Sequence, residues 1–337
     1  MIFSIALPTC TEGLTYPVPF CSVENLVQIA QRAESLGYHS VWGNDHMVTQ
    51  KYVRKDFETP PRYWEPLITY AYLAAKTKTL RFGTGILALP LRRDIVVIAK
   101  QIATLDHLSG GRFELGVGIG AYREEFKALW PDRNAHRGDM TDEGVEALGT
   151  IFTNRVASFE GEYYKYRDAE IYPKLLQEKM PIYFGGNHDN HLRRVVDSEF
   201  ATGWIPASME IGQLRQKIDQ LRTYAVSKGK EPADITIAPQ FVLHVGKNKE
   251  EATARFRQSQ LYKHLVSLRT STLKNQAQFS MEDINLIGSV DEVIEKVVRI
   301  REIGVNHLLG MIIAANDLAE FNDQMQLFAE QVIPCVK

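Results

Sequence analysis

The sequence predicts an α/β fold, a closed (β/α)8 TIM barrel with insertions, formed by a single domain over residues 1–337. Eight short apolar segments of strand type recur along the chain, and nearly every one is followed by a segment with helical spacing of its apolar residues. A length of 337 residues is ordinary for one such barrel. Strands that alternate with helices form a parallel sheet covered by helices, so a doubly wound open sheet is the alternative topology.

The clearest example of this alternation lies in residues 81–120. The helix predicted over residues 95–108 has apolar side chains every three or four positions, and Gly110 ends it because glycine adopts the left-handed conformation cheaply. The predicted strands are residues 2–7, 40–42, 81–85, 113–115, 181–184, 201–204, 235–245 and 307–313. The predicted helices are residues 22–37, 64–77, 95–108, 139–152, 188–197, 211–228 and 289–304, the last with a capping box at Ser289 and Glu292.

Four segments fall outside this alternation. Residues 47–63 are predicted to be an irregular insertion, residues 86–94 a loop, residues 156–180 a hairpin with a linker, and residues 247–286 a polar helical excursion.

Composition limits the classes of partner. A net charge of −2 with dispersed basic residues argues against nucleic acid or an anionic membrane as the main partner. The three cysteines form no disulfide framework and no zinc spacing, which predicts a reducing cytoplasm. The first residues lack the basic region of a signal peptide, and no apolar run reaches the roughly 20 residues that span a bilayer, so we expect no membrane segment.

In a barrel the functional site lies at the carboxyl ends of the strands. His46, preceded by Asp45, follows the second strand, where a histidine can donate a hydrogen bond to a cofactor or act as a base near neutral pH. A structural Asp–His pair is the alternative. Gly85 and Ile86 end the third strand, and the glycine either permits close approach of a flat ligand or merely ends the strand.

Two further glycine-rich segments end strands. Gly116, Gly118 and Gly120 lack the spacing of a dinucleotide-binding motif. Two interpretations are left open: the glycines let the backbone approach a ring system, or they only allow the chain to turn. The segment Gly185-Gly186-Asn187-His188 joins a strand to a helix N-terminus, which suits a phosphate, although a tight turn is the alternative. His188 and His191 have no third ligand of usual spacing nearby, so we expect no metal.

A series of motifs covers nearly the whole chain. They are Gly83-Thr84-Gly85-Ile86, Leu89-Pro90-Leu91-Arg92, residues 99–118, Arg123-Glu124-Glu125-Phe126, Arg137 with Asp142-Glu143, residues 181–186, Gly203-Trp204 and residues 288–309. In this order they resemble the bacterial luciferase-like family of flavin- and deazaflavin-dependent oxidoreductases. One departure is Phe200-Ala201-Thr202-Gly203-Trp204, where the family often has Gly-Asp-Gly-Trp.

The resemblance implies reduced FMN, or alternatively coenzyme F420, at the carboxyl ends of the strands, and a non-proline cis peptide at Gly85–Ile86. It implies that His46 is catalytic and that residues 247–286 contain a mobile lid. The implied cofactor-binding residues are Asp45, Thr84, Gly85, Ile86, Gly116, Gly118, Gly185, Gly186, Asn187 and His188. A homodimer and a separate flavin reductase as partner are also implied by the resemblance alone.

These implications favour a monooxygenase that uses reduced FMN and dioxygen to oxidise a small organic molecule. The alternative is an F420-dependent enzyme that transfers hydride, since the same site residues serve both. Two hypotheses of other classes are a cofactor-binding protein without turnover and a metal-dependent hydrolase. Loss of His46 would favour the first, but His46 is present. The second requires a set of metal ligands, which the sequence lacks.

Overall fold

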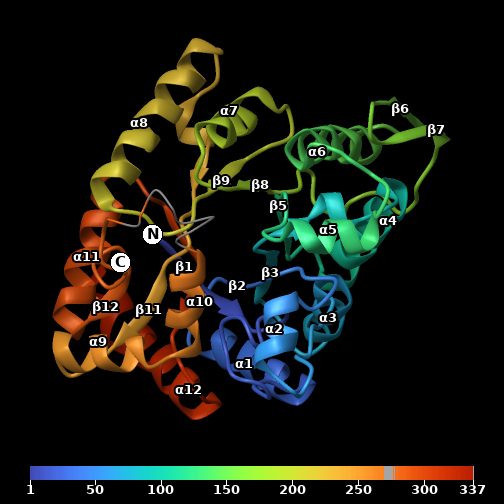
Figure 1. The fold of residues 1–337 in the computed structure, drawn as a ribbon. Coiled ribbons are helices and arrows are strands. Elements are labelled where there is room, and N and C mark those ends of the chain that lie inside the picture. Colours follow the sequence, from blue (N-terminus) through green and yellow to red (C-terminus); the bar gives the residue numbers. More distant parts are fainter. Residues whose placement is uncertain (269–275, 277, 337) are drawn as a thin grey trace.

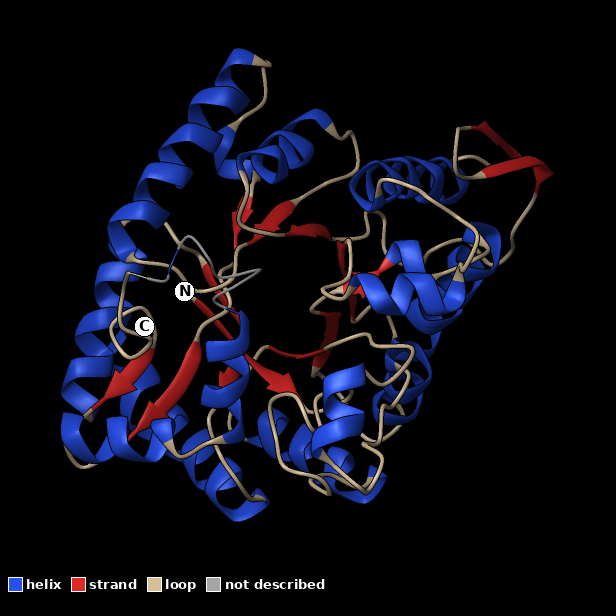
Figure 2. Ribbon diagram, in the orientation of Figure 1, coloured by secondary structure: helices blue, strands red, loops and turns tan. Residues whose placement is uncertain are grey.

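The computed structural model describes residues 1–268, 276 and 278–336, and its parallel strands form a ring with helices on the outside (Figures 1 and 2). Neighbouring strands follow the order β9, β8, β5, β3, β2, β1 and β13. They are β1 (Ile2–Leu7), β2 (Ser40–Gly43), β3 (Arg81–Thr84), β5 (Phe113–Gly118), β8 (Ile182–Gly185), β9 (Gly203–Ile205) and β13 (His307–Ile313).

The segment that we predicted as one strand over residues 235–245 closes the ring. It contains two short strands, of which β10 (Thr236–Ile237) pairs with β9 and β11 (Val242–Val245) pairs with β13. The break lies at Pro239, which has no N–H to donate to a neighbouring strand. Its carbonyl still accepts from the Leu309 N–H at 3.1 Å. Because one segment contacts both β9 and β13, the fold is the predicted barrel and not an open sheet.

Helices follow most strands and cover the barrel. They are α1 (Val23–Ser35), α3 (Pro66–Ala74), α4 (Ile95–Ser109), α6 (Arg137–Thr153), α7 (Asp189–Asp197), α8 (Ile211–Ser227), α11 (Val290–Glu302) and α12 (Leu318–Leu327). The predicted capping box at Ser289 and Glu292 is confirmed, as is the left-handed Gly110 after α4. The periodic apolar side chains of α4 are buried against the strands, as their spacing predicts.

Two segments predicted as irregular contain regular structure. Within residues 47–63 lies α2 (Lys51–Asp56), whose Lys51 N–H donates to Glu124 at 2.9 Å. Within residues 86–94 lie β4 (Leu87–Ala88), which pairs with β5, and a 3-10 turn over Leu89–Leu91. Both predictions were wrong because contacts with residues distant in sequence stabilise these elements.

The remaining elements lie beyond or between the barrel units. Residues 123–129 form α5 (Arg123–Leu129), and the predicted hairpin is confirmed as β6 (Ala157–Glu160) and β7 (Lys165–Ala169). The excursion over residues 247–286 contains α9 (Lys249–Arg257) and α10 (Gln260–Leu268), and it ends where β12 (Leu286–Gly288) begins, a strand that pairs with β11. Residues 269–275 and 277, part of the expected lid, lie outside the described residues. The chain continues after α12 with a π-helical turn over Phe328–Val332 and α13 (Ile333–Val336).

Within the described residues, no helix combines the length and the apolar character that a membrane span requires.

Candidate active site

A cavity of about 330 Å³ lies at the carboxyl ends of the barrel strands. Most of the predicted site residues line it, namely Asp45, His46, Gly85, Ile86, Gly118, Gly185, Gly186, Asn187 and His188. Thr84 and Gly116 do not. The structure therefore brings together predicted residues from four segments that are distant in sequence, at the end of the barrel where enzyme sites occur.

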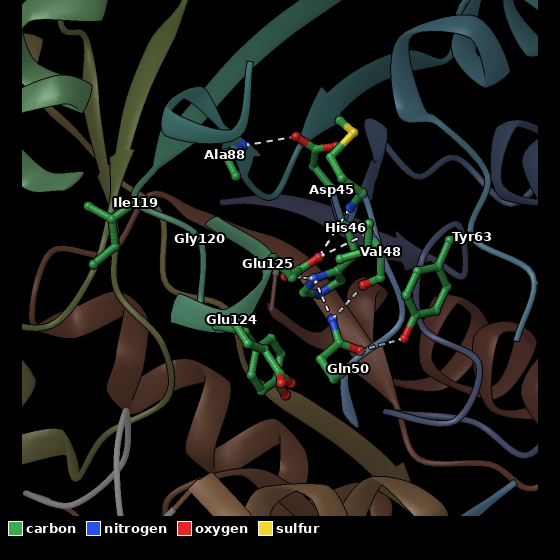
Figure 3. A network of polar contacts seen from close by, with 12 residues as sticks. Asp45, His46, Val48, Gln50, Tyr63, Ala88, Ile119, Gly120, Glu124 and Glu125 are labelled. Carbon is green, nitrogen blue, oxygen red and sulfur yellow. Dashed lines mark hydrogen bonds and ion pairs between the residues drawn. The ribbon is translucent and has the colours of Figure 1, made fainter. Parts of the chain in front are cut away.

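His46 is held by a carboxylate from another part of the barrel. Its Nδ1 lies 2.8 Å from Oε2 of Glu125, which comes from α5 (Figure 3). The other oxygen, Oε1, accepts from the backbone N–H groups of Met47 at 3.1 Å and Val48 at 3.4 Å. The Glu125 carboxylate therefore fixes both the His46 ring and the loop that carries it.

Aromatic and amide side chains surround this pair. The ring centres of Tyr63 and Tyr122 lie 5.8 and 5.7 Å from that of His46. The Tyr63 hydroxyl donates to Oε1 of Gln50 at 2.8 Å (Figure 3). Gln50 belongs to the insertion over residues 47–63, so this insertion forms part of the wall beside His46.

A hydrogen-bonded chain connects the same insertion to α10. The Tyr52 hydroxyl lies 3.0 Å from the Tyr122 hydroxyl and 3.3 Å from Nδ1 of His264. Burial lowers the pKa of His264 to about 4, so its ring is neutral at physiological pH. A neutral Nδ1 can accept a hydrogen bond from Tyr52, which joins α10 to the loop around His46.

Asp45 lines the cavity but its carboxylate is already occupied. Oδ1 lies 2.7 Å from Nη2 of Arg92, and Oδ2 accepts from the Ala88 N–H at 3.0 Å. Burial raises the pKa of the Asp45 carboxyl, and the Arg92 guanidinium opposes that rise. The arrangement ties the end of β2 to β4 and the 3-10 turn, so Asp45 shapes the wall of the cavity.

Ile86 lies at the base of the cavity between two glycines. The Gly85–Ile86 peptide bond is cis, as the resemblance implies. A Cβ at Gly118 would lie 2.9 Å from Cγ1 of Ile86, and one at Gly185 would lie 2.7 Å from its Cγ2. Both positions thus need glycine because the Ile86 side chain occupies the adjacent space. Gly116 and Gly118 also lie within β5 and not beyond the predicted strand end at residue 115.

Thr84 and Gly116 lie behind the cavity, in the interior of the sheet. The Thr84 hydroxyl donates to the Gly116 carbonyl at 2.7 Å and accepts from its N–H at 3.1 Å. A Cβ at Gly116 would lie 2.1 Å from the Thr84 carbonyl oxygen. These two residues therefore hold β3 against β5.

The turn over residues 185–188 leads directly into α7. His188 is the N-cap of this nine-residue helix, and no side chain caps it. The His191 N–H donates to the His188 carbonyl at 2.9 Å, whereas the N–H groups of Asp189 and Asn190 have no acceptor among the described residues. The Asn187 side chain accepts from the Ala207 N–H at 2.8 Å, which fixes the turn against the end of β9. His191 lies buried beneath Gly186, and burial lowers the pKa of His191 to about 4.

Some residues at the site were not predicted from the sequence. Glu125, Ala207 and Gln240 contact the cavity or its histidine. For Glu125 a signal was present in the motif over residues 123–126, but nothing in the sequence paired it with His46. In residues 1–268, 276 and 278–336, no group of three or more His, Cys, Asp or Glu side chains is arranged to hold a metal ion.

The sequence of this chain is similar to those of known flavin- and F420-dependent enzymes. A family model described as luciferase-like monooxygenase matches residues 1–307. The FMNH2-dependent dimethylsulfone monooxygenase of Pseudomonas putida is 26% identical, over 93% of this chain and 86% of that relative. An F420-dependent glucose-6-phosphate dehydrogenase of Amycolatopsis mediterranei is 32% identical, over 47% of this chain and 46% of its own length, so that match spans about half of each protein.

Solved structures share the complete fold at low sequence identity. An F420-dependent secondary alcohol dehydrogenase in complex with an F420–acetone adduct has a TM-score of 0.78 and 20% identity, and covers 100% of this chain and 99% of that one. The FMN complex of the oxygenating constituent of 3,6-diketocamphane monooxygenase from Pseudomonas putida has a TM-score of 0.76 and 18% identity, with 100% and 99% covered. At these identities the likeness concerns the fold alone.

Proposed function

Because this chain belongs to the luciferase-like monooxygenase family, we propose that it is a monooxygenase that uses reduced FMN and dioxygen to oxidise a small organic molecule. One observation carries the proposal. One cavity is lined both by the turn before α7, whose N-terminus no side chain caps, and by a histidine bound to a carboxylate. The relative matched over 93% of this chain is FMNH2-dependent, which supports the choice of cofactor.

The residues around the cavity fit a flavin mononucleotide. The N–H groups of Asp189 and Asn190 at the start of α7, with the turn over residues 185–188, would hold the phosphate, since a helix N-terminus attracts anions. Ile86 and Gly85 would support the ring system. Thr84 and Gly116 would act from behind, by fixing the strands that carry these residues.

Reduced FMN, when bound, supplies the electrons that activate dioxygen. The protein has to bind and orient the reactants, exclude water and move protons. His46 is the residue placed to exchange a proton, because its Nε2 has no hydrogen-bond partner among the described residues. The ion pair of Asp45 with Arg92 and the tyrosines near His46 keep this part of the wall in place.

Hydride transfer with coenzyme F420 is the second candidate function. It is favoured by the F420-dependent relative, although that match covers only 47% of this chain. Anaerobic titration of the protein with FMNH2 and with reduced F420 separates the two. We expect FMNH2 to bind tightly and, on admission of air, to support the formation of an oxygenated product from an added substrate.

Dimethylsulfone is the first compound to test, because it appears in the name of the relative matched over most of the chain. Binding of the deazaflavin alone would contradict the monooxygenase proposal. If neither cofactor binds, the proposal of a flavin enzyme fails.

Several features of the working enzyme also belong to this proposal. We propose a single domain, a homodimer, a separate flavin reductase that delivers FMNH2, and a cytoplasmic location, the last in keeping with the free cysteines Cys10, Cys21 and Cys335. The excursion over residues 247–286 is the proposed cover of the cavity, since Gln260 donates to the Gly13 carbonyl at 3.2 Å and His264 contacts the insertion.

A further inference from the structure

We propose that Glu125 is a positioning residue, which keeps a proton on Nδ1 of His46 and leaves Nε2 as a hydrogen-bond acceptor toward the cavity. Its meaning for catalysis rests on the proposed function, but the tautomer itself is a property of this chain and is measurable without turnover. Two side-chain atoms lie near Nδ1 of His46, and they make opposite demands on it: Oε2 of Glu125 can accept a hydrogen bond, and Nε2 of Gln50 can donate one.

Glu125 is completely buried, and its carboxylate contacts two backbone N–H groups and one ring nitrogen. Oε1 accepts from two backbone N–H groups, those of Met47 and Val48, directly after His46. Oε2 lies 2.8 Å from Nδ1 of His46. An ionised carboxylate is an acceptor only, so Nδ1 must carry the proton in this contact.

Gln50 offers a competing partner. Its Nε2 lies 3.3 Å from the same Nδ1 and 3.4 Å from the Val48 carbonyl. Nδ1 cannot donate to Glu125 and accept from Gln50 at once. The contact with the carboxylate is shorter and is assisted by charge, so it determines the tautomer. The Gln50 amide is then satisfied by the Val48 carbonyl, while its oxygen accepts from Tyr63.

The position of the proton on the His46 ring determines which nitrogen can act as a base. With Nδ1 protonated, Nε2 of the neutral ring holds a lone pair and can take a proton from a reacting group, whose bonding electrons remain behind. The imidazolium that forms keeps its Nδ1–H directed at Glu125, and the carboxylate balances the new charge. Among the described residues, Tyr63, Tyr122, His264 and Cys10 are further titratable groups near His46, and none of them is an anion at neutral pH.

The substitution Glu125→Gln tests this assignment with little change of shape. The two N–H groups of Met47 and Val48 require an acceptor, so they hold the amide oxygen of the new side chain. Its NH2 group then faces Nδ1 of His46 and forces this nitrogen to accept. We therefore expect the proton to move from Nδ1 to Nε2.

Nitrogen-15 NMR of the imidazole rings measures the tautomer directly, with His46→Gln to assign the signal. Wild type should show a protonated Nδ1 and Glu125→Gln a protonated Nε2. Glu124→Gln is the matched control, because it removes the same charge from the adjacent residue of α5, which contacts Lys51 and not His46. An unchanged His46 signal in Glu125→Gln would overturn the proposal, as would a tautomer change in Gln50→Leu.

Turnover provides the second measurement. We expect Glu125→Gln to lower kcat by roughly 10²-fold or more with the Kd for FMNH2 little changed, and Glu125→Asp to restore part of the loss. If the tautomer changes as expected but the wild-type protein never consumes oxygen, then the monooxygenase proposal fails while the positioning role of Glu125 stands. If kcat falls equally in Glu124→Gln, the role in catalysis is refuted.

Discussion

Gly186 is the position at which one added methyl group tests the proposed phosphate site most directly. Its φ is +141°, a conformation that other residues rarely adopt. A Cβ there would lie 2.3 Å from Nε2 of His191. The His191 ring is buried and its Nδ1 contacts the His188 carbonyl at 3.2 Å, so it cannot retreat without moving the turn. Gly186→Ala should therefore displace the turn that leads into α7.

Two contributions make up the loss of unfolding free energy expected for Gly186→Ala. The unfavourable backbone conformation costs about 1–3 kcal/mol, and the steric overlap in a packed region costs a further 1–3 kcal/mol or so. Gly229→Ala is the matched control, since Gly229 has a φ of +72° but no atom within 4 Å of its added Cβ. Denaturant unfolding of both variants should show the larger loss of unfolding free energy in Gly186→Ala. The difference contains the steric part and the higher backbone cost of a φ of +141° compared with +72°.

The contribution of the phosphate to binding is measured by comparing the Kd of reduced FMN with that of reduced riboflavin, which lacks the phosphate. We expect wild type and Gly229→Ala to prefer FMN, and Gly186→Ala to lose about tenfold of that preference, which is about 1.4 kcal/mol. Riboflavin affinity should change little. If Gly186→Ala is less stable yet keeps the full preference for FMN, the phosphate does not bind at residues 185–188 and our reasoning about α7 is refuted.

Three further predictions concern the walls of the cavity and its histidines. His46→Ala should lower turnover strongly while the Kd for FMNH2 stays within about tenfold, and unchanged turnover would remove His46 from the mechanism. Arg92→Met should lower the unfolding free energy by about 3–5 kcal/mol, because it leaves the buried Asp45 carboxylate without its cation, and Asp45→Asn added to it should restore part of the loss. Desolvation lowers the pKa of four histidines, namely His191 (to about 4), His264 (to about 4), His307 (to about 3) and His244. Since the unfolded chain binds protons at these sites first, stability should be complete above about pH 6.5 and fall toward pH 4, by up to about 1.4 kcal/mol per pH unit for each group, and a melting temperature that is constant over this range would contradict it.

The sequence predicts best those features that depend on neighbours along the chain. The helix over Ile95–Ser109 follows from its apolar spacing, and the capping box at Ser289 follows from one residue pair. The barrel itself follows from the repetition of such local units. Even the broken seventh strand has a local cause, since Pro239 stands in its middle.

Features that depend on distant residues were missed. The helix over Lys51–Asp56 is fixed by Glu124, 73 positions away, and His46 is held by Glu125, 79 positions away. A single sequence gives the residue types at both ends of such contacts but not their pairing. The same limit explains why Thr84 and Gly116, expected to contact the cofactor, lie behind the cavity, since the direction of a side chain depends on the register between strands.

The glycines of the site show how one side chain accounts for several sequence signals. Gly118 and Gly185 come from different strands, and each would place a Cβ within 3 Å of Ile86. The pattern around Gly118 therefore reflects packing against a third strand end, and a dinucleotide motif is not needed to explain it. Because Ile86 also lines the cavity, the same packing that closes the barrel interior forms the base of the site. Any substitution that moves Ile86 acts on the barrel core and on the cofactor cavity together, so the two effects are separable only by comparing stability with binding.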